Sequence, residues 1–358
     1  MKKALVFGLS SNLGGVETVF DSFYNHFDKR EYCFDFVARD NNIAYQEKYK
    51  HDGCIVYDVP SFTKRPLRYY YTIKKIILSG KYDMVYINLL SAANVLPIIA
   101  AKNAGVKHII LHAHNSGTVG TMRKLLHFFG KRYLRRQNVI KIACSNKAGH
   151  FIYGDSRYIL INNPFHHELF RYNEEYRNEI RAHYGIQDDC KLIGAVGRLT
   201  LQKNPLFIIE VLKRVHAKNV KLMLIGDGEL KDKILKKIES SGLSDKIIVI
   251  NSKKDVYKYY SAFDLFVMPS KFEALGMVGL EAQASGLCCL FSDSVPRIID
   301  VGRCKFLPLS YDVWANEIDE ESHCSHERNL INSFDFEERF GAKSNSEKLI
   351  SIFDEGAA

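Results

Sequence analysis

The 358-residue sequence has no apolar run that approaches the length of a membrane-spanning helix. Such a helix needs about 18 or more consecutive apolar residues. The first apolar run follows Lys2 and Lys3, as in a secretory signal, but Ser10 and Ser11 end it after a few residues. We therefore expect no transmembrane segment and interpret the first run as a buried strand.

Two common cofactor patterns are also missing. The eight cysteines are scattered and never form a C-x-x-C pair, which counts against a zinc ribbon or a redox motif and favours reduced thiols in a cytoplasmic protein. The sequence contains no G-x-G-x-x-G fingerprint, which counts against a dinucleotide-dependent enzyme.

Acidic residues are absent between Asp83 and Asp155. Residues 1–165 carry 24 Lys and Arg against 11 Asp and Glu, a charge of +13, so the rest of the chain carries −4 of the total of +9. A basic first half and a mildly acidic second half indicate different partners for the two halves.

A basic, apolar segment at residues 122–136 lies within this acid-free stretch. Its expected apolar helical face consists of Met122, Leu125, Leu126, Phe129 and Tyr133. Its cations are Arg123, Lys124, Lys131, Arg132, Arg135 and Arg136. Such a helix can lie on an anionic membrane, at about 1 kcal/mol per cation near the surface; the alternative is a core helix with a solvated basic face. We predict membrane or acceptor binding, and no nucleic acid, because no nucleic-acid motif accompanies the charge.

Apolar runs alternate with helical patterns along the chain, which predicts parallel sheets covered by helices. A polar stretch at 166–189 is interpreted as a connection, and a second series of strands and helices starts at 191. We predict two Rossmann-like domains, 1–165 and 166–335, that face each other across a ligand cleft. A C-terminal helix at about 336–358 is expected to return to the first domain.

The segment Glu273–Glu281 predicts a phosphate site. It follows an apolar run and contains Gly276 and Gly279. A strand that ends in a glycine turn and opens a helix presents free N–H groups and the positive end of the helix dipole, which suits phosphate. The two carboxylates can hold the hydroxyl groups of the molecule that carries the phosphate, so we predict a nucleotide-sugar site.

Two cations follow the strand expected at 191–196. Gly197 ends that strand, and Arg198 and Lys203 come next. The guanidinium fork and the ammonium charge together fit a pyrophosphate, although two solvated surface cations are the alternative. Asp227 and Glu229 loosely mimic a metal–diphosphate motif, but a glycine turn with an acidic first helical turn explains them better, so no metal is expected.

The first domain offers weaker candidates. Gly14 and Gly15 follow the first strand and allow the backbone to approach a phosphate closely. His112 and His114 lie at the carboxyl end of a strand that is expected to start at His108. We assign their side chains to opposite faces, so that one of them can enter the cleft; the alternative for each is a buried, hydrogen-bonded imidazole.

Together these residues resemble the family 4 retaining glycosyltransferases of the GT-B fold, and within it the bacterial capsule and exopolysaccharide enzymes. The matching elements occur in family order: Gly14–Glu17, His114, Asn162–Pro164, Gly197–Leu199, Gln202–Asn204, Gly226–Gly228, Pro269–Ser270 and Glu273–Glu281.

The resemblance implies roles for the matching residues. Arg198 and Lys203 would neutralise the donor diphosphate, and Glu273 would hold sugar hydroxyls. Glu281 would bind the ribose, and His114 would contact the donor sugar near the reacting carbon. The remaining donor-binding residues would be Gly14, Gly15, Gly197, Leu275, Gly276, Met277 and Val278.

The implied activity is transfer from a nucleotide-sugar, expected to be a UDP-sugar, to a lipid-linked or growing polysaccharide acceptor with retention of configuration. The enzyme would need no metal or other cofactor and would sit on the inner face of the plasma membrane. The chain departs from the family at Ala274-Leu275, where Gly-Phe is common, which leaves the identity of the sugar open.

Two alternatives are a sugar-nucleotide epimerase of similar fold and a non-catalytic subunit of a transferase complex. An epimerase would isomerise a nucleotide-sugar without any acceptor. A non-catalytic subunit would be free to lose Arg198, Lys203 and the two glutamates, all of which are present.

Overall fold

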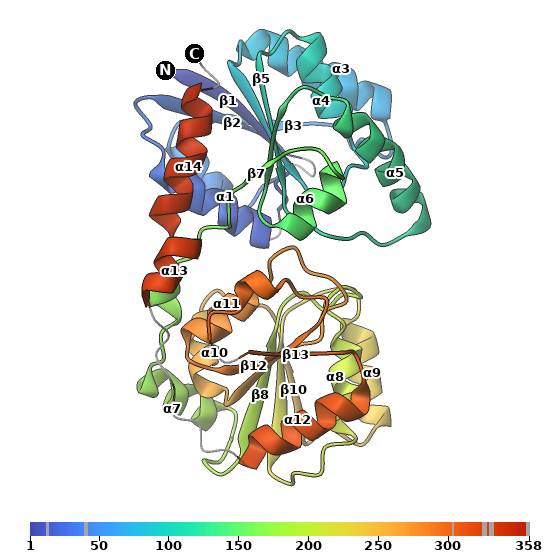
Figure 1. Ribbon diagram of the computed structural model, residues 1–358, viewed down its shortest axis with the longest axis vertical. Coiled ribbons are helices and arrows are strands. Elements are labelled where there is room, and N and C mark those ends of the chain that lie inside the picture. Colours follow the sequence, from blue (N-terminus) through green and yellow to red (C-terminus); the bar gives the residue numbers. More distant parts are fainter. Residues whose placement is uncertain (12–13, 39–41, 303, 324–327, 329–332, 356–358) are drawn as a thin grey trace. The chain divides into compact units, whose positions relative to one another are not determined.

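The computed structural model describes all residues except 12–13, 39–41, 303, 324–327, 329–332 and 356–358. The chain forms two compact units, residues 1–165 with 337–358 and residues 166–336. Each unit is a parallel sheet with helices on both faces (Figure 1). The two doubly wound parallel-sheet domains that we predict are therefore confirmed.

The sheet of the first unit has seven parallel strands in the order β3-β2-β1-β4-β5-β6-β7. They are β1 (Lys2–Phe7), β2 (Tyr32–Ala38), β3 (Val56–Asp58), β4 (Met84–Leu89), β5 (His108–Ala113), β6 (Ile140–Ala143) and β7 (Ile159–Leu160). The chain builds the sheet outward from β1 in one direction and then returns to add β4 on the other side. This reversal creates a topological switch point between β1 and β4, where ligands bind in open α/β sheets.

The helices of the first unit bury apolar residues against this sheet. They are α1 (Gly15–His26), α2 (Gln46–His51), α3 (Pro66–Gly80), α4 (Leu96–Asn103), α5 (Thr121–Arg135), α6 (Asn146–Tyr153) and α14 (Ala342–Glu355). The C-terminal α14 packs beside α1, with the ring of Phe353 4.9 Å from that of Phe27 (Figure 1). Residues from both ends of the chain thus share one hydrophobic core.

The second unit repeats the same topology with six parallel strands in the order β10-β9-β8-β11-β12-β13. They are β8 (Lys191–Val196), β9 (Val220–Ile225), β10 (Ile247–Ile250), β11 (Leu265–Met268), β12 (Cys288–Ser292) and β13 (Cys304–Leu307). Its helices are η1 (His167–Phe170), α7 (Glu174–His183), α8 (Pro205–Leu212), α9 (Lys231–Ser240), α10 (Val256–Ala262), α11 (Met277–Ala284), η2 (Arg297–Ile299) and α12 (Tyr311–His323). The switch point lies between β8 and β11. Helix α13 (Ser333–Phe340) leads to α14.

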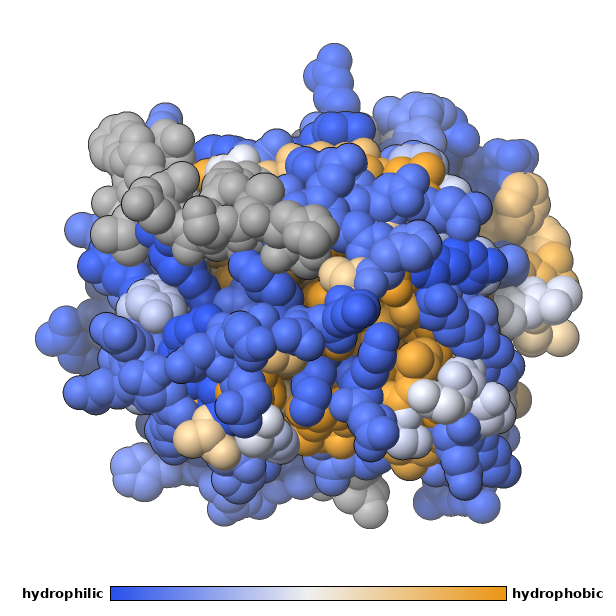
Figure 2. All heavy atoms as spheres, turned by 90° about the horizontal axis from the view of Figure 1, so that it is seen from below, coloured by the Kyte–Doolittle hydropathy of each residue, from blue (hydrophilic) through white to orange (hydrophobic). Residues whose placement is uncertain are grey.

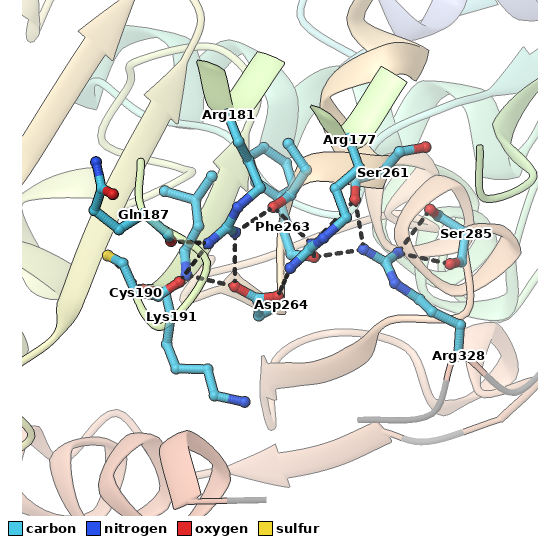
Figure 3. Close-up of polar contacts among 12 residues, drawn as sticks. Arg177, Arg181, Gln187, Cys190, Lys191, Ser261, Phe263, Asp264, Ser285 and Arg328 are labelled. Atoms are coloured by element: carbon cyan, nitrogen blue, oxygen red, sulfur yellow. Dashed lines mark hydrogen bonds and ion pairs between the residues drawn. The ribbon is translucent and has the colours of Figure 1, made fainter. Parts of the chain in front are cut away.

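The interpretation of residues 166–189 as a plain connection is wrong, because this stretch contains α7. Two arginines of α7 hold the helix to the sheet: Arg177 lies 2.8 Å and Arg181 3.1 Å from the carboxylate of Asp264 (Figure 3). The same carboxylate accepts a hydrogen bond of 2.7 Å from the backbone N–H of Leu192 in β8. Polar composition concealed the helix because its anchors are charged.

Helix α12 is another helix of largely polar composition, and it packs on the core of the second sheet. Its Trp314 is fully buried, and the indole N–H donates to the carbonyl of Pro308 at 2.9 Å. One aromatic anchor with a satisfied N–H therefore fixes a helix that is otherwise mostly polar.

The surface of the protein is largely polar, as expected when most apolar residues lie in the two cores. The face drawn in Figure 2 is mainly hydrophilic, with hydrophobic residues visible in the gaps between polar ones. Among the helices described, none is long and apolar enough to cross a membrane. The seven cysteines within the described ranges are free thiols.

The Asp264 cluster gives a test of the fold. Burial would raise the pKa of Asp264, but Arg177, Arg181 and the Leu192 N–H lower it below its ordinary value. We expect Asp264→Asn to lower the free energy of unfolding in urea by about 3–5 kcal/mol, because Arg181 is then buried beside a neutral group. Asp245, which is exposed and has no ion pair among the described residues, provides the control, and Asp245→Asn should change stability by less than about 0.5 kcal/mol. Equal effects of the two substitutions would contradict this account.

Candidate functional site

The donor-site candidates of the second unit gather at its switch point. Gly197 ends β8 with φ +142°, and Gly226 ends β9 with φ +153°. A Cβ at Gly226 would lie only 2.0 Å from the carbonyl oxygen of Gly197. The close approach therefore requires glycine at 226 and fixes the direction in which the chain leaves β8 towards Arg198.

The loop after β8 is joined to the loop after β11 by hydrogen bonds. The Gln202 amide donates to the carbonyl of Phe272 at 3.1 Å, and the Lys271 N–H donates to the carbonyl of Gln202 at 2.8 Å. The Asn204 amide donates to the carbonyl of Pro269 at 3.2 Å. Residues about 70 positions apart in sequence thus form one continuous rim at the carboxyl ends of β8 and β11.

Lys203 and Glu273 form an ion pair on this rim, with Nζ and Oε1 2.6 Å apart. Their side chains are only 20% and 7% exposed, so solvent screens the interaction weakly. The structure thus brings together two residues that the sequence analysis selected separately. Glu273 holds Lys203 in place, and the ammonium group keeps two further donors for an incoming anion.

A cavity of about 30 Å³ beside this pair is lined by Gly197, Arg198, Lys203, Pro269 and Ser270. The hydroxyl of Ser270 is buried and has no hydrogen-bond partner among the described residues. An unsatisfied buried hydroxyl is costly, which makes Ser270 a candidate ligand contact. Sequence reasoning used Ser270 only as part of a motif and gave it no role.

Helix α11 begins at the end of the loop that carries Glu273. Gly276 adopts a left-handed conformation with φ +93° and caps the helix, which begins at Met277. The N–H groups of Met277 and Val278 belong to the first turn and have no acceptor within the helix. Together with the dipole they form a site for a negatively charged group. Leu275 beside them is buried.

Glu281 lies one turn further along α11 and accepts a hydrogen bond of 2.6 Å from the hydroxyl of Tyr260. Burial raises the pKa of Glu281, and the Tyr260 hydrogen bond and the charge of Lys203 only partly offset that effect. The positive charge of Lys203, which lies on the rim, thus acts on the carboxyl group of Glu281. The carboxylate is thus oriented by Tyr260 and leaves its other oxygen available for a hydroxyl group.

Arg328 supports the helices that carry this pair. Its guanidinium donates to the carbonyl of Ser261 in α10 at 2.7 Å and to the carbonyl of Ser285 after α11 at 2.8 Å (Figure 3). It also donates to the carbonyl of Tyr260 in α10 at 3.2 Å. A cation at two helix C-termini satisfies their free carbonyls and opposes their dipoles. Burial lowers the pKa of Arg328 to about 10. Sequence reasoning missed Arg328, because no local pattern links it to α10 or α11.

In the first unit, His112 and His114 lie on and directly after β5. Their assignment to opposite faces is wrong: the ring centroids are 4.1 Å apart. The physical reason is the period of a strand, in which residues i and i+2 point to the same face. His112 is held by the hydroxyl of Tyr86, 2.5 Å from Nδ1.

His114 is fixed by Asn88 at the end of β4. The Asn88 amide N–H donates to the carbonyl of Phe7 at 3.0 Å, so its oxygen accepts from Nε2 of His114 at 2.9 Å. This arrangement sets the tautomer of the imidazole. Burial lowers the pKa of His114 to about 3, so the ring is neutral at physiological pH.

Gly14 and Gly15 lie at the start of α1, with Gly14 extended as the N-cap. The buried Glu17 in the first turn accepts hydrogen bonds from the Ser10 N–H and hydroxyl at 2.9 and 2.8 Å. Glu17 therefore shapes the loop after β1, a structural role that the sequence motif alone did not reveal.

Helix α5 carries five of the six predicted membrane-binding cations, with the sixth, Arg136, at its C-cap, and it exposes its apolar residues. Met122, Leu125, Leu126 and Phe129 are between 43% and 68% exposed, so the core-helix alternative is wrong for them. The helix packs instead through Gly130, where a Cβ would meet the carbonyl oxygen of Ala92 at 1.7 Å. Membrane binding itself remains a prediction.

Comparison with known proteins places this geometry in a family. The model of the family "Glycosyl transferases group 1" matches residues 176–306. The Bacillus subtilis protein "Putative glycosyltransferase EpsF" is 31% identical over 324 residues, which is 86% of this chain and 84% of that protein. The chain belongs to the group 1 glycosyltransferases. A second relative is an Escherichia coli protein named "UDP-Gal:alpha-D-GlcNAc-diphosphoundecaprenol alpha-1,3-galactosyltransferase". This glycosyltransferase is 27% identical to it over 239 residues, which is 62% of this chain and 60% of that protein.

Solved structures support the same assignment at the level of the fold. The crystal structure of Anabaena Alr3699/HepE in complex with UDP-glucose aligns with a TM-score of 0.83 at 17% identity, over 99% of this chain and 100% of that one. The predicted GT-B fold, with two Rossmann-like domains, is thereby confirmed.

The histidine pair predicts an acid-dependent loss of stability. Burial lowers the pKa of both His112 and His114 in the folded state, whereas the unfolded chain takes up protons below a pH of about 6.5. The contribution of the neutral rings is therefore complete above that pH and is lost as the pH falls, by up to about 1.4 kcal/mol per pH unit for each ring.

Urea unfolding between pH 7 and pH 5 tests this expectation. His112→Asn should flatten the pH dependence of the unfolding free energy by about 1.4 kcal/mol per unit below pH 6.5. His183→Gln, at an exposed histidine of α7, should leave the slope as in the parent. A His112→Asn variant with the parental slope would contradict the neutral, buried state.

Proposed function

We propose that this glycosyltransferase transfers a sugar from a UDP-sugar to a lipid-linked or growing polysaccharide acceptor, with retention of anomeric configuration. The product would belong to a capsule, an exopolysaccharide or another cell-surface glycan. The observation that carries the proposal is the Lys203–Glu273 ion pair at the switch point, beside the N-terminus of α11.

The donor diphosphate would bind where the positive groups of the second unit converge. Arg198 and Lys203 line one cavity, and the N–H groups of Met277 and Val278 add a helix N-terminus. Lys203 would remain in contact with Glu273 and use its free donors for phosphate oxygens. The UDP-glucose bound to Alr3699/HepE supports a UDP-sugar as the donor class.

The two glutamates would act as binding groups. Glu273 would accept hydrogen bonds from sugar hydroxyls, and Glu281, oriented by Tyr260, would accept from the ribose hydroxyls. Ser270 would add its buried hydroxyl to the diphosphate contacts. The departures at Ala274 and Leu275 adjoin Glu273, so the choice of sugar would be set there.

The chemistry follows from the charge that develops on the leaving group. As the bond between the anomeric carbon and the diphosphate oxygen breaks, its electron pair moves to the diphosphate, where Arg198 and Lys203 stabilise it. The acceptor hydroxyl would attack from the same face and pass its proton to the leaving phosphate, which retains the configuration. The proposal includes no metal or other cofactor.

His114 would contribute a neutral hydrogen bond to the donor sugar. Its low pKa, about 3, is unsuited to a charged general acid at neutral pH. The backbone at Gly14 and Gly15 would approach the phosphate from the loop after β1.

The proposal for the acceptor is based on helix α5 and on the name of a similar protein. The E. coli protein is named for an acceptor linked to diphosphoundecaprenol. The exposed apolar residues of α5 would enter the interfacial layer of a membrane, while Arg132, Arg135 and Arg136 would bind its anionic headgroups. We therefore propose a peripheral location on the inner face of the plasma membrane, which would bring a lipid-linked acceptor to the enzyme.

Lys203 gives a test of the donor site. We expect Lys203→Ala to reduce kcat/KM for the UDP-sugar about ten- to a hundredfold, because a charge-assisted contact to the leaving diphosphate is worth about 1.5–3 kcal/mol. Lys218→Ala, at an exposed lysine without an ion pair among the described residues, is the control and should keep parental activity. Unchanged kcat/KM in Lys203→Ala would remove this residue from the site.

Vesicle binding tests the role of α5. We expect Arg135→Glu/Arg136→Glu to weaken binding to vesicles that contain phosphatidylglycerol by at least about tenfold at 0.1 M salt, since each cation near the surface contributes about 1 kcal/mol. Phe128→Ser/Phe129→Ser should weaken binding at high salt as well, because those side chains act through burial. The matched charge reversal Lys253→Glu/Lys254→Glu should have little effect. Equal partitioning of all variants would dismiss a membrane role for α5.

A further inference from the structure

A larger hollow of about 410 Å³ lies elsewhere on the second unit, and it shares no lining residue with the cavity beside Lys203. It is formed by α8, α9, the loop after β11 and the start of α12. Its volume falls in the range of about 300–1,000 Å³ that is typical of ligand sites. The roles proposed above leave it unused.

The hollow is positively charged. Lys233, Lys237 and Lys271 line it together with one carboxylate, Glu210. That carboxylate is already paired, at 2.5 Å from Lys237 and 3.1 Å from Lys213. The ammonium groups of Lys233 and Lys271 have no hydrogen-bond or ion-pair partner in the described part of the chain. Two uncompensated cations in a concave wall attract an anion.

The same hollow offers an aromatic surface. The rings of Phe207 and Tyr311 stack at 4.9 Å with an angle of 29° between their planes. The edge of Trp314 supports Phe207 from the core at 5.4 Å, and the guanidinium of Arg214 lies 4.8 Å from the Tyr311 centroid. Tyr311 is 41% exposed and is held between Phe207 and Arg214, so it presents the free edge of its ring and its hydroxyl to the hollow.

The walls of the hollow are continuous with the donor rim. Asn204 and Lys271 line it, and they are the direct neighbours of Lys203 and Ser270 in sequence. The hydrogen bonds of Asn204 to Pro269 and of Lys271 to Gln202 belong to the rim itself. An occupant of the hollow would therefore touch the backbone that positions Lys203.

We propose that this hollow is a binding subsite for an acidic sugar residue, namely a carboxylate-bearing pyranose of the acceptor glycan. The carboxylate pairs with Lys233 and Lys271, and the apolar C–H groups of the sugar ring pack against the exposed edge of Tyr311. The cations match the carboxylate that distinguishes such a sugar from a neutral one, and the aromatic ring matches the apolar C–H groups that both kinds of sugar carry. The inference rests on the proposed function, because it assigns the glycan acceptor to the acidic class.

Calorimetric titration with tetragalacturonate, and with maltotetraose as the neutral counterpart, tests the subsite without any turnover. We expect tetragalacturonate to bind at least about tenfold more tightly than maltotetraose, with an affinity that falls as salt rises. Lys233→Gln/Lys271→Gln should weaken tetragalacturonate binding about tenfold, the modest size expected of exposed ionic contacts. Lys218→Gln/Lys236→Gln, at two exposed lysines outside the hollow, should bind like the parent.

Three results would overturn the proposal: equal affinity for the two oligosaccharides, parental affinity in Lys233→Gln/Lys271→Gln, or binding of inorganic phosphate with no binding of tetragalacturonate. Titration with UDP alone separates this inference from the proposed function. If UDP binds to the parent and to all variants but tetragalacturonate does not bind, the subsite fails and the donor site stands. If tetragalacturonate binds as expected but UDP does not, the proposed function fails instead.

Discussion

The ion pair between Lys203 and Glu273 is the interaction on which the candidate site depends. It joins the loop after β8 to the loop after β11, and three backbone hydrogen-bond acceptors on those loops hold the same junction. A lysine alone on a flexible loop would lose side-chain entropy on binding a phosphate. Glu273 removes much of that cost by orienting Lys203 in advance, and the charge of Lys203 in turn reaches Glu281.

The same topology places candidate residues at the carboxyl ends of the strands in both units. In the second unit the loops after β8 and β11 meet, and in the first unit Asn88 of β4 links the ends of β1 and β5 through its hydrogen bonds to Phe7 and His114. A switch point can hold a ligand because neighbouring chain connections depart to opposite faces of the sheet. Buried groups such as Tyr260, Arg328 and Glu17 then fix the directions of the residues that would touch the donor.

Sequence reasoning predicted the architecture well, because alternating apolar runs and glycine turns are local signals. It also selected Lys203 and Glu273, although only the fold shows that they pair. It failed where contacts between residues far apart in the sequence determine the structure. Arg177 and Arg181 hold α7 in place through Asp264. Arg328 binds α10 and α11 from a distant segment. The error on His112 and His114 had a simpler cause, a misapplied strand period, and the short distance between the two rings corrects it.

A crystal structure of the protein with UDP would locate the diphosphate without any assumption about sugar or acceptor. We expect phosphate oxygens within hydrogen-bond distance of Lys203 Nζ and of the N–H groups at the start of α11, with the ribose hydroxyls on Glu281. A diphosphate bound away from Lys203 and α11, with the Lys203–Glu273 pair untouched, would contradict this expectation.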